Sequence, residues 1–252
     1  MKVFAEYAHY YDLLYQDKAY KREVVYIDAL IKRYAGYSKK DLLDVGCGTG
    51  NHALWLVKKG YRVVGIDRSF EMIDIAKSRI GGGDNIKFYK ADSTRFNLKH
   101  KFDIAISLFH VMSYQITNES LYHSFKNVYT HLRKNGLFIF DFWYGPAVLS
   151  QKPTTRLKKI KYRDTIIERI ATPTMQVDKN RVDIQYTIDI KDEKRKVIKR
   201  VKEIHSMRYF FLPELHFMLA DVGFKIVANL RWLSFKKELN TRNWSGVLIA
   251  RK

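Results

Sequence analysis

The 252-residue sequence predicts an α/β fold with a seven-stranded, mostly parallel sheet, helices on both of its faces and an inserted antiparallel β-layer. Three observations favour this fold. Short apolar runs alternate with stretches of helical periodicity from residue 42 to residue 142, as in parallel sheets with helical crossovers. The first of these runs, residues 42–45, ends in a glycine-rich turn. Between about Pro153 and Arg208 the period becomes alternating, which is typical of antiparallel strands.

The glycine-rich turn reads Asp44-Val45-Gly46-Cys47-Gly48-Thr49-Gly50 and leads into a helix near residue 51. Gly46 lets the backbone turn, and Gly48 leaves no Cβ where a ligand must lie against the main chain. A second buried strand, residues 62–66, ends in Asp67, at the position where a mononucleotide-binding half-fold sets a carboxylate against a ribose. The sequence therefore predicts a nucleoside-binding crevice at the ends of these two strands.

The remaining core elements follow in order. Residues 5–15 form an unusually aromatic segment, and a helix with an apolar stripe from Val24 to Tyr34 follows it. Ser69 can cap the next helix, which glycines 81–83 end. Strands are expected at residues 86–89, 102–107 and 137–142, with a helix between the last two that begins at residue 118 and stops at residues 134–136. A helix from Pro213 and strands at 224–228 and 246–250 complete the sheet.

The alternating region predicts antiparallel strands at residues 165–170, 182–188 and 197–204. We interpret it as a β-layer over the mouth of the crevice. The expected organisation is a Rossmann-like core with an N-terminal lid at 1–148, the β insertion at 149–209 as a substrate cover or dimer contact, and residues 210–252 returning to the core sheet.

The formal net charge of +20 suggests either a polyanionic partner or a solvated basic face. Residues 150–208 hold 17 lysines and arginines against 8 acidic residues, so much of the excess lies in the insertion. The single cysteine, Cys47, excludes an internal disulfide and a cysteine-based zinc site, and we interpret it as a small residue of the turn. With no apolar stretch suited to a membrane span or signal peptide, we expect a cytoplasmic protein.

The third glycine of the turn, Gly50, comes one residue too early for the dinucleotide fingerprint. The turn, with Asp67 after it, instead resembles motif I of class I S-adenosylmethionine (SAM) methyltransferases. The resemblance implies that Asp44, Gly46 and Gly48 surround the methionine part of SAM and that Asp92 accepts a hydrogen bond from the adenine amino group. Tyr11 is expected to face the SAM sulfonium, because aromatic rings attract cations. The full predicted cofactor-binding set is Tyr11, Asp44, Gly46, Cys47, Gly48, Asp67, Arg68, Met72, Asp92, Ser93, Leu108 and Phe109.

The whole-chain layout is similar to that of nucleotide-aminosugar N-methyltransferases. The similar features are the Tyr-Tyr-Asp start at 10–12, the tripeptide at 107–109, the strand exit at 141–146 and the insertion. The resemblance implies a nucleoside-diphosphate sugar carrying an amine, with its diphosphate near Arg156, Lys158 or Lys159. No metal site is predicted, and the chain is expected to be a monomer or a homodimer.

Three residues are candidates to orient the acceptor amine or to take its proton: His110, Tyr11 and Tyr144. His110 follows a strand of the sheet, at the edge where open α/β sheets bind ligands, and a histidine titrates near neutrality. His110 could equally be a residue of the cavity wall beside adenine. His205 is a further candidate for the acid–base role. Two other functions stay open: an RNA (tRNA) methyltransferase that uses the basic surface, and a SAM-binding regulator without catalysis.

Overall fold

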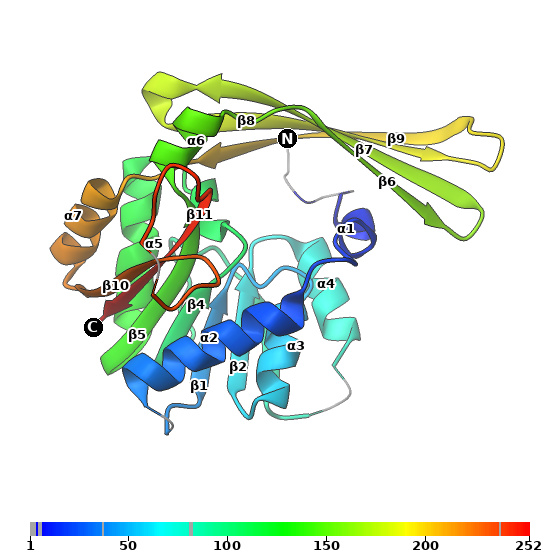
Figure 1. Cartoon of the computed structure of the whole chain (residues 1–252). Coiled ribbons are helices and arrows are strands. Elements are labelled where there is room, and N and C mark those ends of the chain that lie inside the picture. Colours follow the sequence, from blue (N-terminus) through cyan, green and yellow to red (C-terminus); the bar gives the residue numbers. More distant parts are fainter. Residues whose placement is uncertain (1–3, 5–6, 37, 81–82, 237) are drawn as a thin grey trace.

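The computed structural model describes residues 4, 7–36, 38–80, 83–236 and 238–252, which form a seven-stranded and a four-stranded sheet (Figure 1). The larger sheet has the order β10-β11-β5-β4-β1-β2-β3. Strands β1 to β5 are parallel, whereas β11 pairs antiparallel with both β5 and β10. The mostly parallel seven-stranded sheet is therefore confirmed. Its strands are β1 (Asp41–Val45), β2 (Arg62–Asp67), β3 (Ile86–Lys90), β4 (Phe102–Ser107), β5 (Leu132–Trp143), β10 (Lys225–Arg231) and β11 (Ser245–Arg251).

The central strands are apolar on both faces because each face packs on its own layer of helices. In β1, Leu42 belongs to one core and its neighbour Leu43 to the other, as alternation along a strand requires. The first core lies against α2 (Tyr20–Ala35), α3 (Asn51–Lys58) and α4 (Phe70–Ser78), and the second against α5 (Asn118–His131) and α7 (Leu212–Val222). Helices thus cover both faces, as predicted.

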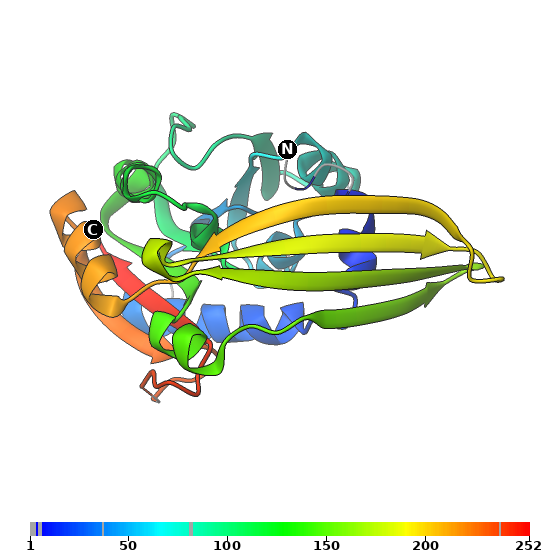
Figure 2. The ribbon, with the colours of Figure 1, turned by 90° about the horizontal axis from the view of Figure 1, so that it is seen from above.

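The smaller sheet has the order β6-β7-β8-β9 and is antiparallel throughout. Its strands are β6 (Arg156–Tyr162), β7 (Thr165–Gln176), β8 (Arg181–Lys191) and β9 (Val197–Arg208), preceded by α6 (Gly145–Gln151). It extends over the carboxyl ends of the core strands and projects beyond them (Figures 1 and 2). The three predicted strands are present, and β6 is an additional one.

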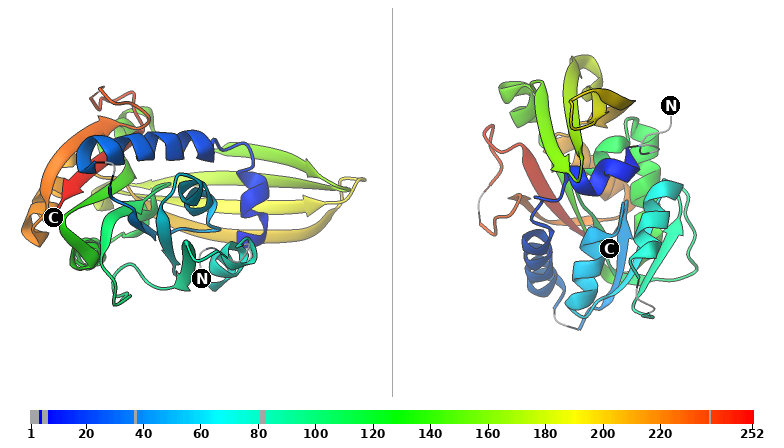
Figure 3. Two further views of the ribbon diagram at one scale, coloured as in Figure 1. Left: turned by 90° about the horizontal axis from the view of Figure 1, so that it is seen from below. Right: turned by 90° about the vertical axis from the view of Figure 1, so that its right-hand side faces the viewer.

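Helix α1 (Ala8–Leu14) lies between the two sheets (Figures 1 and 3). Its flanking Tyr7 and its own Leu14 are buried in one apolar cluster with isoleucines of the insertion, among them Ile167 and Ile188. The expected lid is therefore a short helix that packs on the underside of the insertion.

Two boundaries differ from expectation. Strand β5 begins at Leu132, directly after α5, where a helix stop was expected at residues 134–136. The turn falls inside the strand, as an irregularity in its pairing with β4 in which Asn135 adopts a φ of 64°. Gly81 and Gly82, expected to end the helix after Ser69, lie outside the described residues. No helix among the described parts of the chain is long and apolar enough to cross a membrane.

Candidate active site

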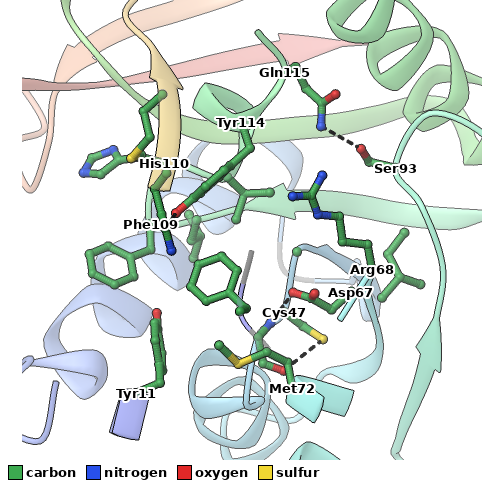
Figure 4. Close-up of a pocket in the computed structure, with 18 of the residues that line it drawn as sticks. Tyr11, Cys47, Asp67, Arg68, Met72, Ser93, Phe109, His110, Tyr114 and Gln115 are labelled. Atoms are coloured by element: carbon green, nitrogen blue, oxygen red, sulfur yellow. Dashed lines mark hydrogen bonds between the residues drawn. The ribbon is translucent and has the colours of Figure 1, made fainter. Parts of the chain in front are cut away.

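A cavity of about 710 Å³ lies between the carboxyl ends of β1, β2 and β4, the lid helix α1 and strands β8 and β9 of the insertion. Its volume is typical of small-molecule sites. Among its lining residues are most of the predicted site: Tyr11, Gly46, Cys47, Gly48, Asp67, Arg68, Met72, Asp92, Ser93, Leu108, Phe109, His110 and His205. Figure 4 shows Tyr11 and Phe109 on one side of this space and Ser93, Arg68 and Gln115 on the other, with Tyr114 between them.

Some predicted residues lie elsewhere. Tyr144 precedes α6 and pairs with Phe210 in an isolated bridge, and it is absent from the cavity lining, where its neighbour Trp143 lies instead. The basic side chains expected to hold a diphosphate also lie outside it. Lys158 pairs with Asp17 of the segment after α1, and Lys159 pairs with Glu168 on the adjacent strand. Arg156 is exposed and does not line the cavity either.

The glycine-rich turn has the backbone that its sequence predicts. Gly46 has a φ of 76°, and a Cβ there would lie 2.3 Å from the side chain of Val111, so no other residue fits without displacement. Gly48 has a φ of 54°, and a Cβ built on it meets nothing within 4 Å, so it faces open space in the cavity. Asp67 organises the turn, because its Oδ2 accepts the backbone N–H of Gly48 at 3.0 Å and its Oδ1 that of Ser69 at 2.9 Å. Burial raises its pKa above the ordinary value, against these two hydrogen bonds.

Asp44, which was predicted to contact the cofactor, lies beneath the turn, is 2% exposed and is not among the residues that line the cavity. Its Oδ2 is buried and has no hydrogen-bond partner among the described residues. Burial, with a smaller contribution from Asp67 and opposed by His52, raises the pKa of Asp44 to about 6. A buried carboxylate oxygen without a partner fits a cationic donor, so this atom matches the ammonium that a methionine moiety carries.

The other end of the crevice carries hydrogen-bonding groups suited to a base. Asp92 accepts from both the backbone N–H and the hydroxyl of Thr94 through Oδ1. Burial acts to raise the pKa of Asp92, but these hydrogen bonds outweigh it and lower the pKa below the ordinary value. Gln115 donates to the hydroxyl of Ser93 at 3.1 Å and lines the same wall. Both Asp92 and Ser93 thus line the cavity, and the contact of Asp92 with adenine stays a prediction.

Phe109 and His110 follow β4 with φ values of 67° and 61°, so two consecutive non-glycine residues are left-handed. Such backbone conformations cost about 1–3 kcal/mol each and are retained where surrounding contacts hold them. Here Asp141, at the end of the adjacent strand β5, accepts the backbone N–H of His110 at 3.0 Å. The other oxygen of Asp141 lies 2.9 Å from His110 Nδ1. Asp141 therefore fixes the backbone of His110 at the cavity wall, and its carboxylate lies against the ring without a hydrogen bond to Nδ1.

The lid is joined to the core through Asp12, which sequence reasoning did not single out beyond its place in the aromatic segment. Its Oδ1 accepts from the Thr49 hydroxyl and the Asn51 amide, both at 2.8 Å, and its Oδ2 pairs with Arg79. Arg79 in turn donates to the backbone carbonyl of Thr49. The chain places these residues far apart in sequence, so only the fold reveals the cluster.

The thiol of Cys47 is buried in the turn. Burial, with smaller contributions from Asp44 and Asp67, raises its pKa well above the ordinary value. A thiol held in its neutral form is a poor nucleophile, which agrees with its interpretation as a small turn residue. The described residues contain no group of three or more histidine, cysteine, aspartate or glutamate side chains that could hold a metal ion.

Residues 42–136 match the protein family described as "Methyltransferase domain". A putative methyltransferase of Geobacillus sp. (strain WCH70) is 29% identical over 139 residues, 55% of this chain and 56% of the relative. This chain spans only about half the length of that relative, and about half the length of a putative methyltransferase of Bacillus subtilis (strain 168). A dTDP-3-amino-3,4,6-trideoxy-alpha-D-glucopyranose N,N-dimethyltransferase of Streptomyces venezuelae is 22% identical over 223 residues, 88% of this chain and 91% of the relative.

Solved structures share the fold over the whole length. DesVI of Streptomyces venezuelae superposes with a TM-score of 0.80 at 21% identity, covering 98% of each chain. An S-adenosylmethionine-dependent methyltransferase of Clostridium acetobutylicum ATCC 824 gives 0.79 at 22% identity, covering 98% of this chain and 97% of its own. The domain match supports the predicted methyltransferase domain over residues 42–136, and these likenesses confirm the predicted fold.

Proposed function

From a chain that carries a class I SAM-dependent methyltransferase domain, we propose a methyltransferase that acts on a small-molecule acceptor, the amine of a nucleotide-linked aminosugar. The names of three relatives support the acceptor class, since each is a dTDP-aminosugar N,N-dimethyltransferase at 22–25% identity. The proposal goes beyond those names only where residues of this chain support it.

The observation that carries the proposal is the roof of the cavity. The same space that is lined by the glycine turn and Asp67 is also lined by Tyr186 of β8 and by residues 204–207 of β9, with Tyr7 and Tyr11 of the lid at its side. The nucleoside-binding crevice therefore continues beneath the insertion as one cavity. A cavity of this size suits a small acceptor, whereas double-stranded RNA is recognised across a wide, shallow groove and through its phosphates.

The residues fit SAM at three points. The Asp67 carboxylate can accept the hydroxyl protons of a ribose, the partnerless Oδ2 of Asp44 can accept the methionine ammonium, and Gly48 leaves open space against the main chain. When bound, SAM supplies an electrophilic methyl group on its sulfonium. Alignment and exclusion of water are then the main tasks of the protein, and the lid and the insertion serve them.

His110 is the proposed acid–base residue. Asp141 lies against Nδ1, so the other ring nitrogen, Nε2, is the one available to a substrate proton. A methylated amine must lose one proton for each methyl group that it gains, and an imidazole beside a carboxylate can take it. Tyr11, a lid residue of the same cavity, is the proposed aromatic neighbour of the sulfonium.

Arg68 replaces the insertion lysines as the proposed contact for the diphosphate. Within the described chain it is the one lysine or arginine that lines the cavity, and it forms no salt bridge there with another described residue. Its charge opposes the raised pKa of Asp67 and contributes to the lowered pKa of Asp92, and a guanidinium can bind phosphate oxygens through two donors.

The test is methyl transfer from labelled SAM to a panel of dTDP- and UDP-linked aminosugars, their hydroxyl counterparts and total tRNA. Labelling of an aminosugar alone supports the proposal. Labelling of tRNA, with binding that falls steeply with salt, supports the RNA alternative instead. Tight SAM binding without transfer to any acceptor supports the regulator, and either of these two outcomes overturns the proposal.

A further inference from the structure

Opposite Asp67, three polar side chains form a hydrogen-bonded chain from the cavity into the insertion. The Tyr114 hydroxyl, at the end of the short helix η1 (Val111–Tyr114), lies 2.9 Å from Nδ1 of His205 on β9. Nε2 of His205 lies 3.2 Å from Oε2 of Glu203. Tyr114 and His205 both line the cavity, whereas Glu203 is 4% exposed and lies behind them.

Contacts with the lid determine the direction of the hydrogen bonds between Tyr114, His205 and Glu203. Glu203 accepts the backbone N–H of Phe4 through Oε2 at 2.8 Å and that of Tyr7 through Oε1 at 3.1 Å. Hydrogen bonding to the ionised form lowers the pKa of Glu203 below its ordinary value, although burial opposes this. An ionised carboxylate can only accept hydrogen bonds, so His205 must donate from Nε2.

A neutral imidazole that donates from Nε2 accepts at Nδ1, so the Tyr114 hydroxyl must give its proton to His205. Burial lowers the pKa of His205, and Arg68 and Arg169 lower it further, which outweighs Glu203 and keeps the ring neutral near pH 7. The rings of Phe4, Tyr7 and Tyr186 surround His205, with centroids 4.8–5.4 Å from its own. The Tyr7 hydroxyl is engaged with Tyr15, and the Tyr114 hydroxyl is the group that contacts Nδ1.

We propose that Tyr114 is a specificity-determining residue that presents only lone pairs to the cavity and so selects an acceptor group that donates a hydrogen bond, such as an amine, with His205 and Glu203 as positioning residues behind it. This rests on the proposed function and deepens it. An amine that donates one N–H to the Tyr114 oxygen is held by that bond, which restricts where its own lone pair points. An acceptor group without a donor leaves the Tyr114 oxygen unpaired, which is unfavourable in a covered site.

The first test needs no acceptor. In protein with nitrogen-15-labelled histidine, NMR at pH 7 should show His205 neutral and protonated on Nε2. In Glu203→Leu no side-chain atom accepts from Nε2, so we expect the preference for the Nε2-protonated form to be lost. A charged ring or an Nδ1-protonated ring in the wild type, or an unchanged ring in a folded Glu203→Leu protein, would contradict the proposed chain of protons.

The second test measures the selection itself. Calorimetric Kd values are compared for a dTDP-aminosugar and its deoxy counterpart, which lacks the amine, with SAM affinity measured in parallel. We expect Tyr114→Phe to reduce the preference for the amine by about tenfold or more and to leave the SAM Kd unchanged. Tyr209→Phe is the matched control, because its hydroxyl donates to the Val177 carbonyl outside the cavity and the preference should persist.

The possible outcomes distinguish failure of the Tyr114 role from failure of the proposed function. If the wild type binds and methylates aminosugars but Tyr114→Phe keeps the full preference for the amine, the role of Tyr114 is wrong and the proposed function stands. If the wild type shows no preference for the amine over the deoxy sugar, the selection is refuted directly. If neither compound binds and the acceptor panel stays unlabelled, the proposed function fails, and the selection fails with it even where the predicted His205 proton is found.

Discussion

The cluster around Asp12 predicts how firmly the lid is held on the cofactor side. Asp12 joins α1 to the first residues of α3, and a carboxylate is favoured there because the positive end of a helix dipole lies nearby. Other polar contacts of the N-terminal segment run to the insertion, through the backbone N–H groups of Phe4 and Tyr7 on Glu203, and to the start of α4, where the Ser69 hydroxyl donates to the Phe4 carbonyl. Asp12 is thus the polar link between the lid helix and the glycine turn.

The magnitude follows from the bonds that Asp12→Ala removes. Two hydrogen bonds to a charged oxygen and one ion pair are lost, and hydrogen bonds to charged groups contribute about 1.5–3 kcal/mol each. Asp12 and Arg79 are 30% and 28% exposed, so solvent screening reduces the sum. We expect a net loss of about 2 kcal/mol in lid docking, equivalent to a roughly thirtyfold shift towards the undocked lid.

Two assays measure this shift. SAM release in a stopped-flow experiment and amide hydrogen exchange over residues 8–14 should both accelerate, by up to about thirtyfold, with Asp12→Asn intermediate because it keeps one oxygen acceptor. Asp17→Asn is the control, since its pair with Lys158 is at a position 69% exposed and contributes little. Unchanged SAM release and unchanged exchange in Asp12→Ala would refute the assignment of Asp12 as the link.

Further predictions concern the same cavity. His110→Ala should bind SAM with unchanged Kd but lose turnover by about 100-fold or more, and normal turnover would remove His110 as the acid–base residue. The raised pKa of Asp44, about 6, means that the empty site favours its protonated form below that pH, so SAM affinity should weaken about tenfold per pH unit below pH 6. Asp44→Asn should abolish that slope in calorimetry. Gly46→Ala should lower the melting temperature and weaken SAM binding, because the added Cβ meets Val111 at 2.3 Å.

Local sequence patterns were sufficient to predict the strands of the core sheet. Strand β4 has the predicted bounds, and Ser69 caps α4 by accepting the backbone N–H of Met72, as its position suggested. Strand β6 was missed because lysines lie on both of its faces. Lys158 and Ile160 point towards the lid, whereas Leu157 and Lys159 point away, so no apolar alternation marks the strand.

The site residues were predictable where each one directly follows a strand that the sequence identifies. The glycine turn, Asp67 and Asp92 lie at strand ends that the sequence identifies, whereas the chain from Tyr114 through His205 to Glu203 joins residues 91 positions apart. Sequence spacing has no access to such a contact, because it depends on how the insertion folds back over the core. His205 was nevertheless among the candidates, because it lies near the predicted junction between the insertion and the core.

The pairing of His110 with Asp141 lies between these two cases. Strands β4 and β5 are parallel neighbours in the register Ser107 with Phe140, so the residues that follow them emerge at the same edge of the sheet. Given five crossover-connected strands in the predicted sheet, a histidine after one strand and an aspartate at the end of the next could have been paired before the structure was known. That inference needs strand order as well as strand position, and the order β1-β4-β5 is set by the helices that cross between strands on the two faces. The proposed catalytic geometry therefore depends on which strand ends are adjacent, and a search for motifs along the chain does not test adjacency.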